Sequence, residues 1–219
     1  QRNYFFFSDF TPNPKYLDAV KGAKLFVKES CDLIIAIGGG STIDIAKLIN
    51  AAQSDLKNFK QIATGKKKLN KKIKKLIAIP TTAGTGSEST HFAVVYIREK
   101  KYSLAANILL PNIAIIDPVL AYKVPKYLAA SCAFDALTQS IESYWSIKSS
   151  KKSRALSIKS IKLILGNLNK SINLKDKNSI KKIMVAANLS GQAINITKTT
   201  APHALSYKIS DLAKISHGH

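Results

Sequence analysis

The chain has 219 residues, 46% of them hydrophobic, which is enough to bury one large core or two smaller ones. No apolar run approaches the ~20 residues of a membrane span, and the first residues lack a signal-peptide pattern, so we expect a cytoplasmic protein without a membrane partner. Its two cysteines, Cys31 and Cys132, are too few for a disulfide framework and fit a reducing compartment.

The formal net charge of +21 raises the hypothesis of a nucleic-acid or polyanion partner. Lysine supplies nearly all of this charge, because arginine occurs only at Arg2, Arg98 and Arg154. The densest lysine cluster, at 66–75, has no aromatic residues among its lysines, as the binding of a single strand would require. We therefore interpret the charge as lysine spread over solvated faces and do not favour a nucleic-acid partner.

The first half of the chain alternates expected helices and strands. Apolar residues at helical spacing predict a helix at 14–28, followed by a strand at 33–37 and a second helix at 42–53. Further strands are expected at 76–79, 92–97 and 112–117. Short β-branched runs, such as those at 33–37 and 112–117, are typical of buried parallel strands. The last strand is expected to stop at Asp117-Pro118.

Two of these strands run directly into glycine-rich loops. The segment 33–47, LIIAIGGGSTIDIAK, has the order strand, glycine turn, helix, which points free backbone N–H groups at a phosphate. Its spacing excludes both G-x-G-x-x-G and the P-loop, and an ordinary turn between strand and helix is the alternative. The segment 76–88, LIAIPTTAGTGSE, is similar, so we expect the two loops to line one ligand crevice.

From about residue 125 onward the pattern changes to helices alone, expected at 126–147, 151–166, 177–194 and 200–214. An α/β half followed by an all-helical half predicts two domains, 1–122 and 123–219.

Residues of the helical half have the spacing of metal ligands. Asp135 and Gln139 lie four apart, on one helix face. An uninterrupted helix would separate His203 and His217 by roughly 21 Å, so they can share an ion only if the chain reverses, at 210–211 or at 215–216. An Asp and two His with an open position suit a divalent Lewis acid. The spacing alone is a weak signal, and ordinary structural roles stay open. Surface or polar contacts are expected for the other histidines, His91 and His219.

Taken together, these stretches resemble the iron-containing (group III) alcohol dehydrogenase family, which shares the dehydroquinate-synthase-like fold. The resemblance implies an α/β Rossmann-like N-terminal domain and an all-α C-terminal domain, both incomplete here. It implies that GGGSTIDIAK at 38–47 binds the cofactor pyrophosphate and that PTTAGTGSE at 80–88 lies on the nicotinamide side. The implied contacts of NAD(P)H are Gly38, Gly39, Gly40, Ser41, Asp44, Thr81, Thr82, Thr85, Ser87 and Lys101.

The resemblance also implies a divalent ion, Fe²⁺ or Zn²⁺. FDALTQSIES at 134–143 matches the family's helix with the first two ligands, and the implied set is Asp135, Gln139, His203 and His217. The second ligand is normally a histidine, and because Gln139 is a weaker and harder ligand, affinity should drop. A further family histidine near the substrate is Tyr207 here, which is not an easy proton shuttle near neutral pH. No catalytic residue is assigned.

The Gln139 and Tyr207 pattern, with SESTHFAVVY at 87–96 and APHALSYKIS at 201–210, resembles the family's phosphonoacetaldehyde reductases. This implies NAD(P)H-dependent reduction of a small anionic aldehyde, phosphonoacetaldehyde, to 2-hydroxyethylphosphonate. The alternatives are a general short-chain alcohol dehydrogenase, a lyase-type member of the superfamily, an inactive fragment, or a polyanion-binding protein. The sequence does not fix the oligomeric state, and a homodimer is compatible with it. The resemblance implies a longer chain, extending beyond both ends of these 219 residues.

Overall fold

The structure, a computed structural model, describes residues 3–213 and 215–219. It divides into two compact units, one of Gln1–Ile79 with His91–Ala114 and one of Pro80–Thr90 with Ile115–His219. The first is α/β and the second is helical, as predicted. The predicted domain boundary after residue 122 differs from this division, which ends unit 1 at Ala114 and assigns the segment 80–90 to unit 2. Among the described helices, none is both long and apolar enough to cross a membrane.

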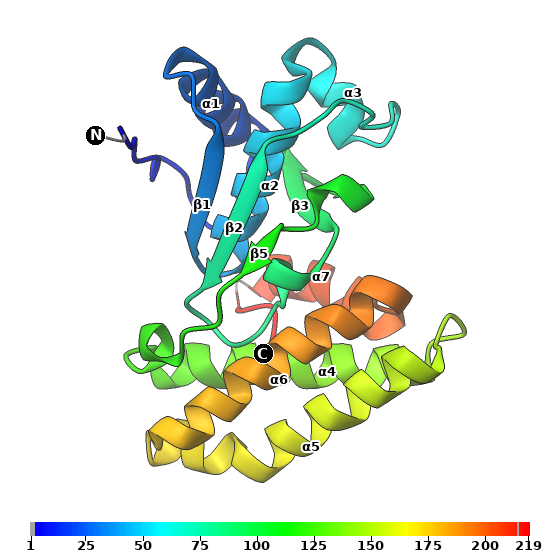
Figure 1. Cartoon of the computed structure of the whole chain (residues 1–219). Coiled ribbons are helices and arrows are strands. Elements are labelled where there is room, and N and C mark those ends of the chain that lie inside the picture. The colour runs from blue at the N-terminus through cyan, green and yellow to red at the C-terminus, as the bar shows by residue number, and fades with distance from the viewer. Residues whose placement is uncertain (1–2, 214) are drawn as a thin grey trace. The chain divides into compact units, whose positions relative to one another are not determined.

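Unit 1 contains a three-stranded sheet and a separate hairpin. The sheet has the order β1-β2-β5, with β2 parallel to β5 and Ile77 paired with Ile113 (Figure 1). The hairpin pairs β3 and β4 antiparallel, with Phe92 opposite Ala105. The elements, in chain order, are α1 (Tyr16–Lys28), β1 (Leu33–Gly38), α2 (Gly40–Ser54), η1 (Leu56–Asn58), α3 (Phe59–Ala63), β2 (Lys75–Pro80), β3 (Phe92–Ile97), β4 (Lys100–Ala105), η3 (Asn107–Leu109) and β5 (Ile113–Ala114).

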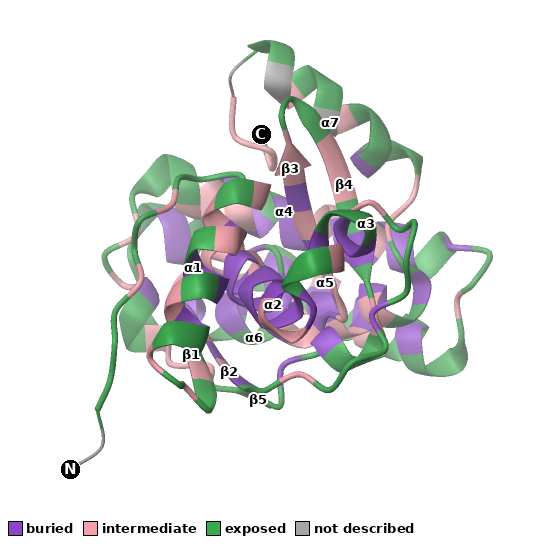
Figure 2. Ribbon diagram, turned by 90° about the horizontal axis from the view of Figure 1, so that it is seen from above, coloured by how far each residue is buried: buried purple, intermediate pink, exposed green. Residues whose placement is uncertain are grey.

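The helix α2 is the centre of unit 1 and is buried along most of its length (Figure 2). Its apolar residues Leu48 and Ile49 belong to a core that also includes Phe59 and Val95. Its polar residues hold β3: Asp44 Oδ2 accepts the Val94 N–H at 2.9 Å. The fully buried Lys47 donates from Nζ to the carbonyl oxygen of Phe92, also at 2.9 Å. Because a buried ammonium without hydrogen bonds is very costly, this contact is part of what keeps Lys47 in the core.

Two strand predictions for the sheet were wrong in part. The strand expected at 112–117 pairs only over Ile113–Ala114, and Ile113 is 52% exposed. In β1, Ala36 is buried but Ile35 and Ile37 are 55% and 58% exposed, so this strand is not buried on both faces. In β1 the exposed Ile35 and Ile37 share one face, so only the opposite face, with Ala36, is covered. In β5 both residues are exposed, because this short strand lies at the edge of the sheet. The helix α3 and the strand β4 were not predicted.

Unit 2 is built on α4, α5 and α6, which pack through small side chains. The serine Ser140 of α4 donates to Ser160 Oγ on α5, which in turn donates to the carbonyl oxygen of Ala186 on α6, each at 2.8 Å. Small residues allow the helices to approach closely, and these hydrogen bonds satisfy their buried hydroxyls. The elements are η2 (Ser87–Ser89), η4 (Pro118–Ala121), α4 (Lys126–Trp145), α5 (Lys151–Asn173), α6 (Lys177–Thr197) and α7 (Ala201–Ala213).

The segment 80–90 packs on α6, which is why it belongs to unit 2. Gly86 has a φ of +61°, and a Cβ on Gly191 would collide with the Gly86 backbone, so glycine is needed on both sides of this contact. Asn188 of α6 donates from Nδ2 to Glu88 Oε1 at 2.9 Å and to Ser89 Oγ at 2.6 Å. The loop is therefore held by both backbone packing and side-chain hydrogen bonds.

Candidate metal centre and cofactor loops

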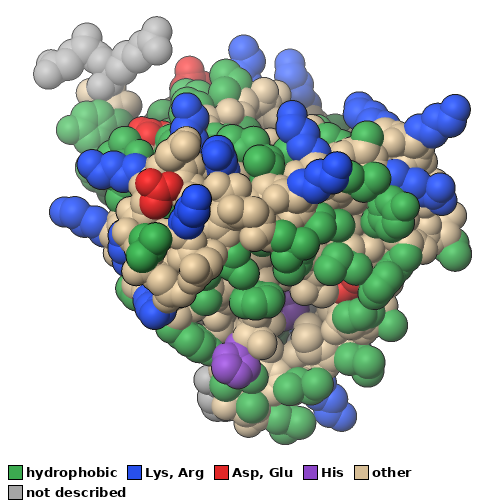
Figure 3. Space-filling model, turned by 90° about the horizontal axis from the view of Figure 1, so that it is seen from below, with side chains coloured by type: hydrophobic (Ala, Val, Ile, Leu, Met, Phe, Trp, Pro, Cys, Tyr) green, Lys and Arg blue, Asp and Glu red, His purple; other side chains and the backbone are tan. Residues whose placement is uncertain are grey.

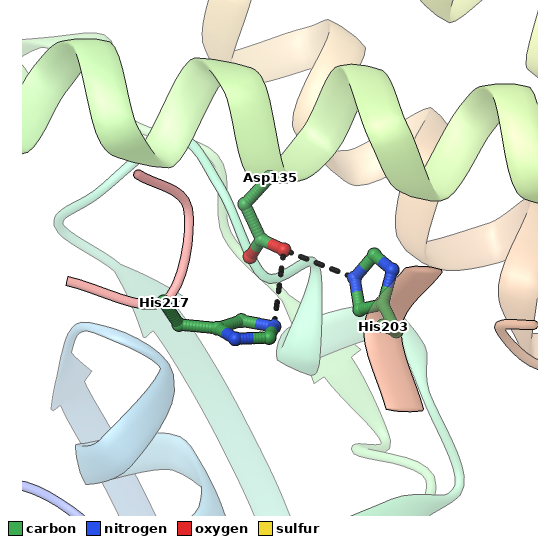
Figure 4. A group of neighbouring side chains, drawn as sticks. All are labelled: Asp135, His203 and His217. Atoms are coloured by element: carbon green, nitrogen blue, oxygen red, sulfur yellow. Dashed lines mark hydrogen bonds and ion pairs between the residues drawn. The ribbon is translucent and has the colours of Figure 1, made fainter. Parts of the chain in front are cut away.

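The helix α4 supplies three buried polar side chains on one face: Asp135, Gln139 and Glu142. They stand at positions i, i+4 and i+7, which share a helix face. Asp135 points toward two histidines from other segments (Figure 4). One face of α4 thus carries a row of carboxylate and amide groups, which would be costly to bury without partners.

The two histidines reach Asp135 from opposite sides of a chain reversal. His203, in the first turn of α7, places Nε2 3.2 Å from Asp135 Oδ1. His217 places Nε2 3.8 Å from the same oxygen. Because α7 continues to Ala213, the chain reverses after that residue and not at 210–211. Gly218 packs against the Ser131 backbone, where a Cβ would collide, so the returning segment lies close to α4.

The donor set fits a divalent ion. One ligand atom each of Asp135, His203 and His217 lies within 4.8 Å of the other two. A carboxylate with two imidazoles is a donor set that Zn²⁺ and Fe²⁺ accept, and both ions take further ligands beside these three. The remaining predicted ligand, Gln139, is buried one turn from Asp135, and its Oε1 accepts a hydrogen bond from Ser190 Oγ at 2.9 Å.

The buried carboxylates of the candidate metal centre shift the pKa values of neighbouring groups. Burial lowers the pKa of His203, but hydrogen bonds to Asp135 and Glu142, together with their charges, raise that pKa above its ordinary value. Burial raises the pKa of Cys132 to about 11, with the Asp135 charge adding to the effect and a hydrogen bond to Thr82 opposing it. Cys132 is therefore a protonated thiol at neutral pH.

The residues expected to bind pyrophosphate lie where β1 meets α2. Gly38 ends the strand, Gly39 is the N-cap and Gly40 begins the helix, so the free N–H groups of the first turn follow the strand directly. The first turn of α2 has no acidic side chain, which leaves its positive end available to an anion. Ser41 Oγ accepts the Asn13 N–H at 3.4 Å. Asp44 is engaged with Val94 of β3, a contact the sequence did not predict.

The other expected cofactor residues are distributed over both units. Thr81, Thr82, Thr85 and Ser87 lie in the segment 80–90 of unit 2, where Thr85 Oγ1 accepts the Ser87 N–H at 3.2 Å. Lys101 lies on β4 of unit 1, paired with Tyr96. Tyr207 lies on α7, and its side chain falls outside the described part of the structure.

Sequence reasoning missed Glu142 and Thr200. Glu142 is fully buried, and its Oε1 lies 2.5 Å from His203 Nδ1. Its Oε2 accepts hydrogen bonds from the backbone N–H and the hydroxyl of Thr200. The spacing of seven residues from Asp135 was a signal that could have found Glu142. Nothing local marks Thr200.

Comparison with known proteins identifies the family. A family model described as "Iron-containing alcohol dehydrogenase" matches residues 1–118, and one described as "Fe-containing alcohol dehydrogenase family, C-terminal" matches residues 129–219. The chain therefore belongs to the iron-containing alcohol dehydrogenase family, which confirms the predicted family. Membership brings with it NAD(P) and a divalent metal as cofactors, as predicted.

Individual relatives agree with this assignment. Long-chain-alcohol dehydrogenase 1 of Geobacillus thermodenitrificans is 34% identical, over 97% of this chain and 54% of its own length. An aldehyde-alcohol dehydrogenase of Streptococcus pneumoniae is 34% identical, over 98% of this chain and 26% of its own. The crystal structure of sulfoacetaldehyde reductase from Bifidobacterium kashiwanohense in complex with NAD⁺ has a TM-score of 0.93 at 32% identity, covering 97% of this chain and 57% of that one. The chain thus spans between a quarter and just over half of these relatives.

Proposed function

We propose that this chain belongs to an enzyme that reduces a small aldehyde to the alcohol with NAD(P)H and a divalent metal ion. The observation that carries the proposal is the convergence of Asp135, His203 and His217, whose donor atoms lie within 4.8 Å of one another. These residues come from distant parts of the chain and are mostly buried, an arrangement that a purely structural role does not require.

The metal would be held by Asp135, His203 and His217, with Gln139 as the fourth ligand. When bound, the nicotinamide would supply the hydride and the ion would polarise the substrate carbonyl as a Lewis acid. The chain's own contribution is to fix these ligands: α4 orients Asp135, and α7 presents His203 with its second ring nitrogen on Glu142. Preorganisation of this kind is how a protein stabilises charge that develops on the substrate oxygen.

The cofactor would bind through the two glycine-rich loops. We propose that the pyrophosphate binds at 38–41, with Asp44 close by, where the N-terminus of α2 offers free N–H groups. The hydroxyls of Thr81, Thr82, Thr85 and Ser87 would contact the cofactor from the segment 80–90, and Lys101 would supply a positive charge. Each of these residues is proposed from the family resemblance.

Phosphonoacetaldehyde is the proposed substrate. Gln139 and Tyr207, at positions where the family normally has histidine, support it. Sulfoacetaldehyde reductase, to which the chain is similar, is named for another anionic two-carbon aldehyde. A phosphonate needs cationic or N–H donors, and lysine is abundant in this chain. A general short-chain alcohol dehydrogenase is the alternative within the family.

The test measures NAD(P)H oxidation by the protein that the full open reading frame containing this chain encodes. Phosphonoacetaldehyde, sulfoacetaldehyde and acetaldehyde are assayed in parallel. Each is measured with and without added Fe²⁺ or Zn²⁺. We expect metal-dependent turnover of phosphonoacetaldehyde that His203→Ala abolishes. Turnover of acetaldehyde at an equal rate would support the general dehydrogenase. No oxidation with any aldehyde would contradict the proposal and favour an inactive relative.

A polyanion-binding protein remains the alternative from another class. On the face drawn in Figure 3, most lysine and arginine side chains lie toward the top of the view, with hydrophobic and uncharged side chains between them. A nucleic-acid interface would gather them into a continuous basic stripe. Steep salt dependence of DNA binding, together with no binding of NADH, would favour this alternative.

A further inference from the structure

We infer that Glu142 is a positioning residue for the proposed metal centre, because its carboxylate holds the proton of His203 on Nδ1 and leaves Nε2 to face Asp135. The inference rests on the proposed metal site and adds a residue that touches neither metal nor substrate. The geometry is direct: Glu142 Oε1 lies 2.5 Å from His203 Nδ1, on the side of the ring away from Asp135. An ionised carboxylate can only accept, and Asp135 faces Nε2 at 3.2 Å as Glu142 faces Nδ1. We place the single proton of the neutral ring on Nδ1 because the distance to Glu142 is much shorter.

Glu142 itself is oriented by donors that cannot exchange roles. The backbone N–H of Thr200 always donates, and it points at Glu142 Oε2. The hydroxyl of Thr200 also donates to Oε2, at 2.9 Å. Trp145, one turn beyond Glu142 on α4, donates from Nε1 to that hydroxyl at 3.2 Å. Because an indole N–H cannot accept, the chain of hydrogen bonds from Trp145 through Thr200 to Glu142 has one direction.

Because of this fixed direction, an amide cannot replace the carboxylate of Glu142. Glu142 is fully buried, and both of its oxygens receive donors. In Glu142→Gln, the amide oxygen can serve only one side. The two donors of Thr200 outnumber the single donor of His203, so the oxygen should face Thr200 and the NH₂ group should face His203. His203 must then accept at Nδ1 and carry its proton on Nε2, where it would block metal binding.

The experiment compares the wild-type chain with Glu142→Gln by two readouts. The first is the ¹⁵N spectrum of His203 in metal-free protein, at an alkaline pH where the ring is neutral. The second is the affinity for Zn²⁺ alone, by competition with a chelator. We expect the Nδ1–H tautomer in wild type and the Nε2–H tautomer in the variant. Loss of an outer-shell partner typically weakens metal binding by about 10–100-fold, which is the drop expected here.

Ser143→Ala is the matched control. Ser143 is the next residue of α4, is equally buried, and pairs its Oγ with Thr197 Oγ1 at 2.9 Å, apart from the metal ligands. It should keep the Zn²⁺ affinity and the tautomer of wild type. An equal loss of affinity in Ser143→Ala would overturn the inference, since any disturbance of α4 would then suffice.

Other outcomes also decide the question. An Nε2–H tautomer in wild type would overturn the inference without any variant, so it can fail even if Glu142→Gln does not fold. Unchanged affinity and tautomer in a folded Glu142→Gln would overturn it as well. Absence of Zn²⁺ binding by wild type would instead overturn the metal centre of the proposed function, and this inference with it.

Discussion

The glycine loop of unit 1 and the candidate metal centre of unit 2 are built in opposite ways. The loop at 38–41 comes from one continuous stretch, in which β1 ends, the chain turns on glycine and α2 begins. The candidate metal centre joins Asp135, His203 and His217, and Glu142 and Thr200 are hydrogen-bonded around it. The loop therefore depends on local backbone geometry, whereas the centre depends on the packing of α4, α7 and the segment after it.

The largest expected effect is the loss of Zn²⁺ affinity when His203 is replaced. His203→Ala removes a proposed ligand and also leaves the buried carboxylates of Asp135 and Glu142 without their shared partner. We expect Zn²⁺ affinity to fall by at least about 100-fold, beyond the range for outer-shell residues. Chelator competition measures this loss. His219→Ala is the control, because His219 contacts Tyr127 at 3.2 Å and lies outside the donor set. Equal losses in both variants would contradict the assigned ligands.

A second prediction tests how the segment 80–90 is held. In Gly191→Ala the new Cβ would meet the backbone of Gly86, and backbone atoms cannot move aside as a flexible side chain can. We expect a loss of about 1–3 kcal/mol in the free energy of unfolding, as for other overpacked sites. The measurement is chemical denaturation.

Gly166→Ala in α5 is the matched control, because nothing lies within 4 Å of its Cβ position. The same helix-propensity gain should there stabilise the chain by roughly 0.5–1 kcal/mol. The two substitutions should thus have opposite signs. If Gly191→Ala were also stabilising, the close packing of Gly86 on α6 would be wrong.

Gln139 stands where the family normally has histidine, so a substitution there should increase Zn²⁺ affinity. Replacing Gln139 with histidine introduces the imidazole that the family normally has, which binds Zn²⁺ and Fe²⁺ better than an amide oxygen. It also removes the hydrogen bond from Ser190. We expect a net increase in Zn²⁺ affinity of about tenfold, the lower end of single-partner effects. Ser190→Ala separates the two contributions, and a Gln139→His variant that binds more weakly than wild type would count against Gln139 as a ligand.

At the glycine loop we expect one substitution to increase the stability of the chain and to weaken NADH binding. Ser41→Asp places a negative charge in the first turn of α2, which favours the helix by about 0.3–1 kcal/mol. The same charge should repel the cofactor pyrophosphate, so we expect weaker NADH binding in a slightly more stable chain. Fluorescence titration and thermal unfolding measure the two effects. Ser150→Asp, at the N-cap of α5, adds the same charge without touching the loop. Unchanged NADH affinity in Ser41→Asp would contradict the proposal that the pyrophosphate binds at the N-terminus of α2.

What the sequence could predict follows from this difference between the two sites. The order of β1, Gly38 and α2 is local, so hydrophobic period and glycine position sufficed for it. Asp135 and Gln139 could be placed on one face from their spacing, but the reversal that returns His217 to Asp135 is a tertiary feature. The partners of Glu142 and the packing of Gly86 on Gly191 were out of reach for the same reason. The exposure of Ile113 was missed because an apolar run does not reveal which faces of a sheet are covered.

The smallest expected effect is a change in stability at the N-terminus of α6, the helix that holds the segment 80–90 through Asn188 and Gly191. Asp176 is the N-cap, and its Oδ2 accepts the Ser179 N–H at 2.7 Å. Hydrogen bonds from Ser179 hold the pKa of Asp176 below its ordinary value. A carboxyl whose pKa is lower in the folded chain stabilises the fold above its unfolded-state pKa, and this contribution is lost as the pH falls through the folded-state value.

Asp176→Ala should therefore lower the melting temperature at neutral pH, and the difference from wild type should shrink below about pH 4. Thermal unfolding from pH 7 to pH 3 measures it, and a difference that stays constant over that range would mean that the ionised carboxylate does not cap α6.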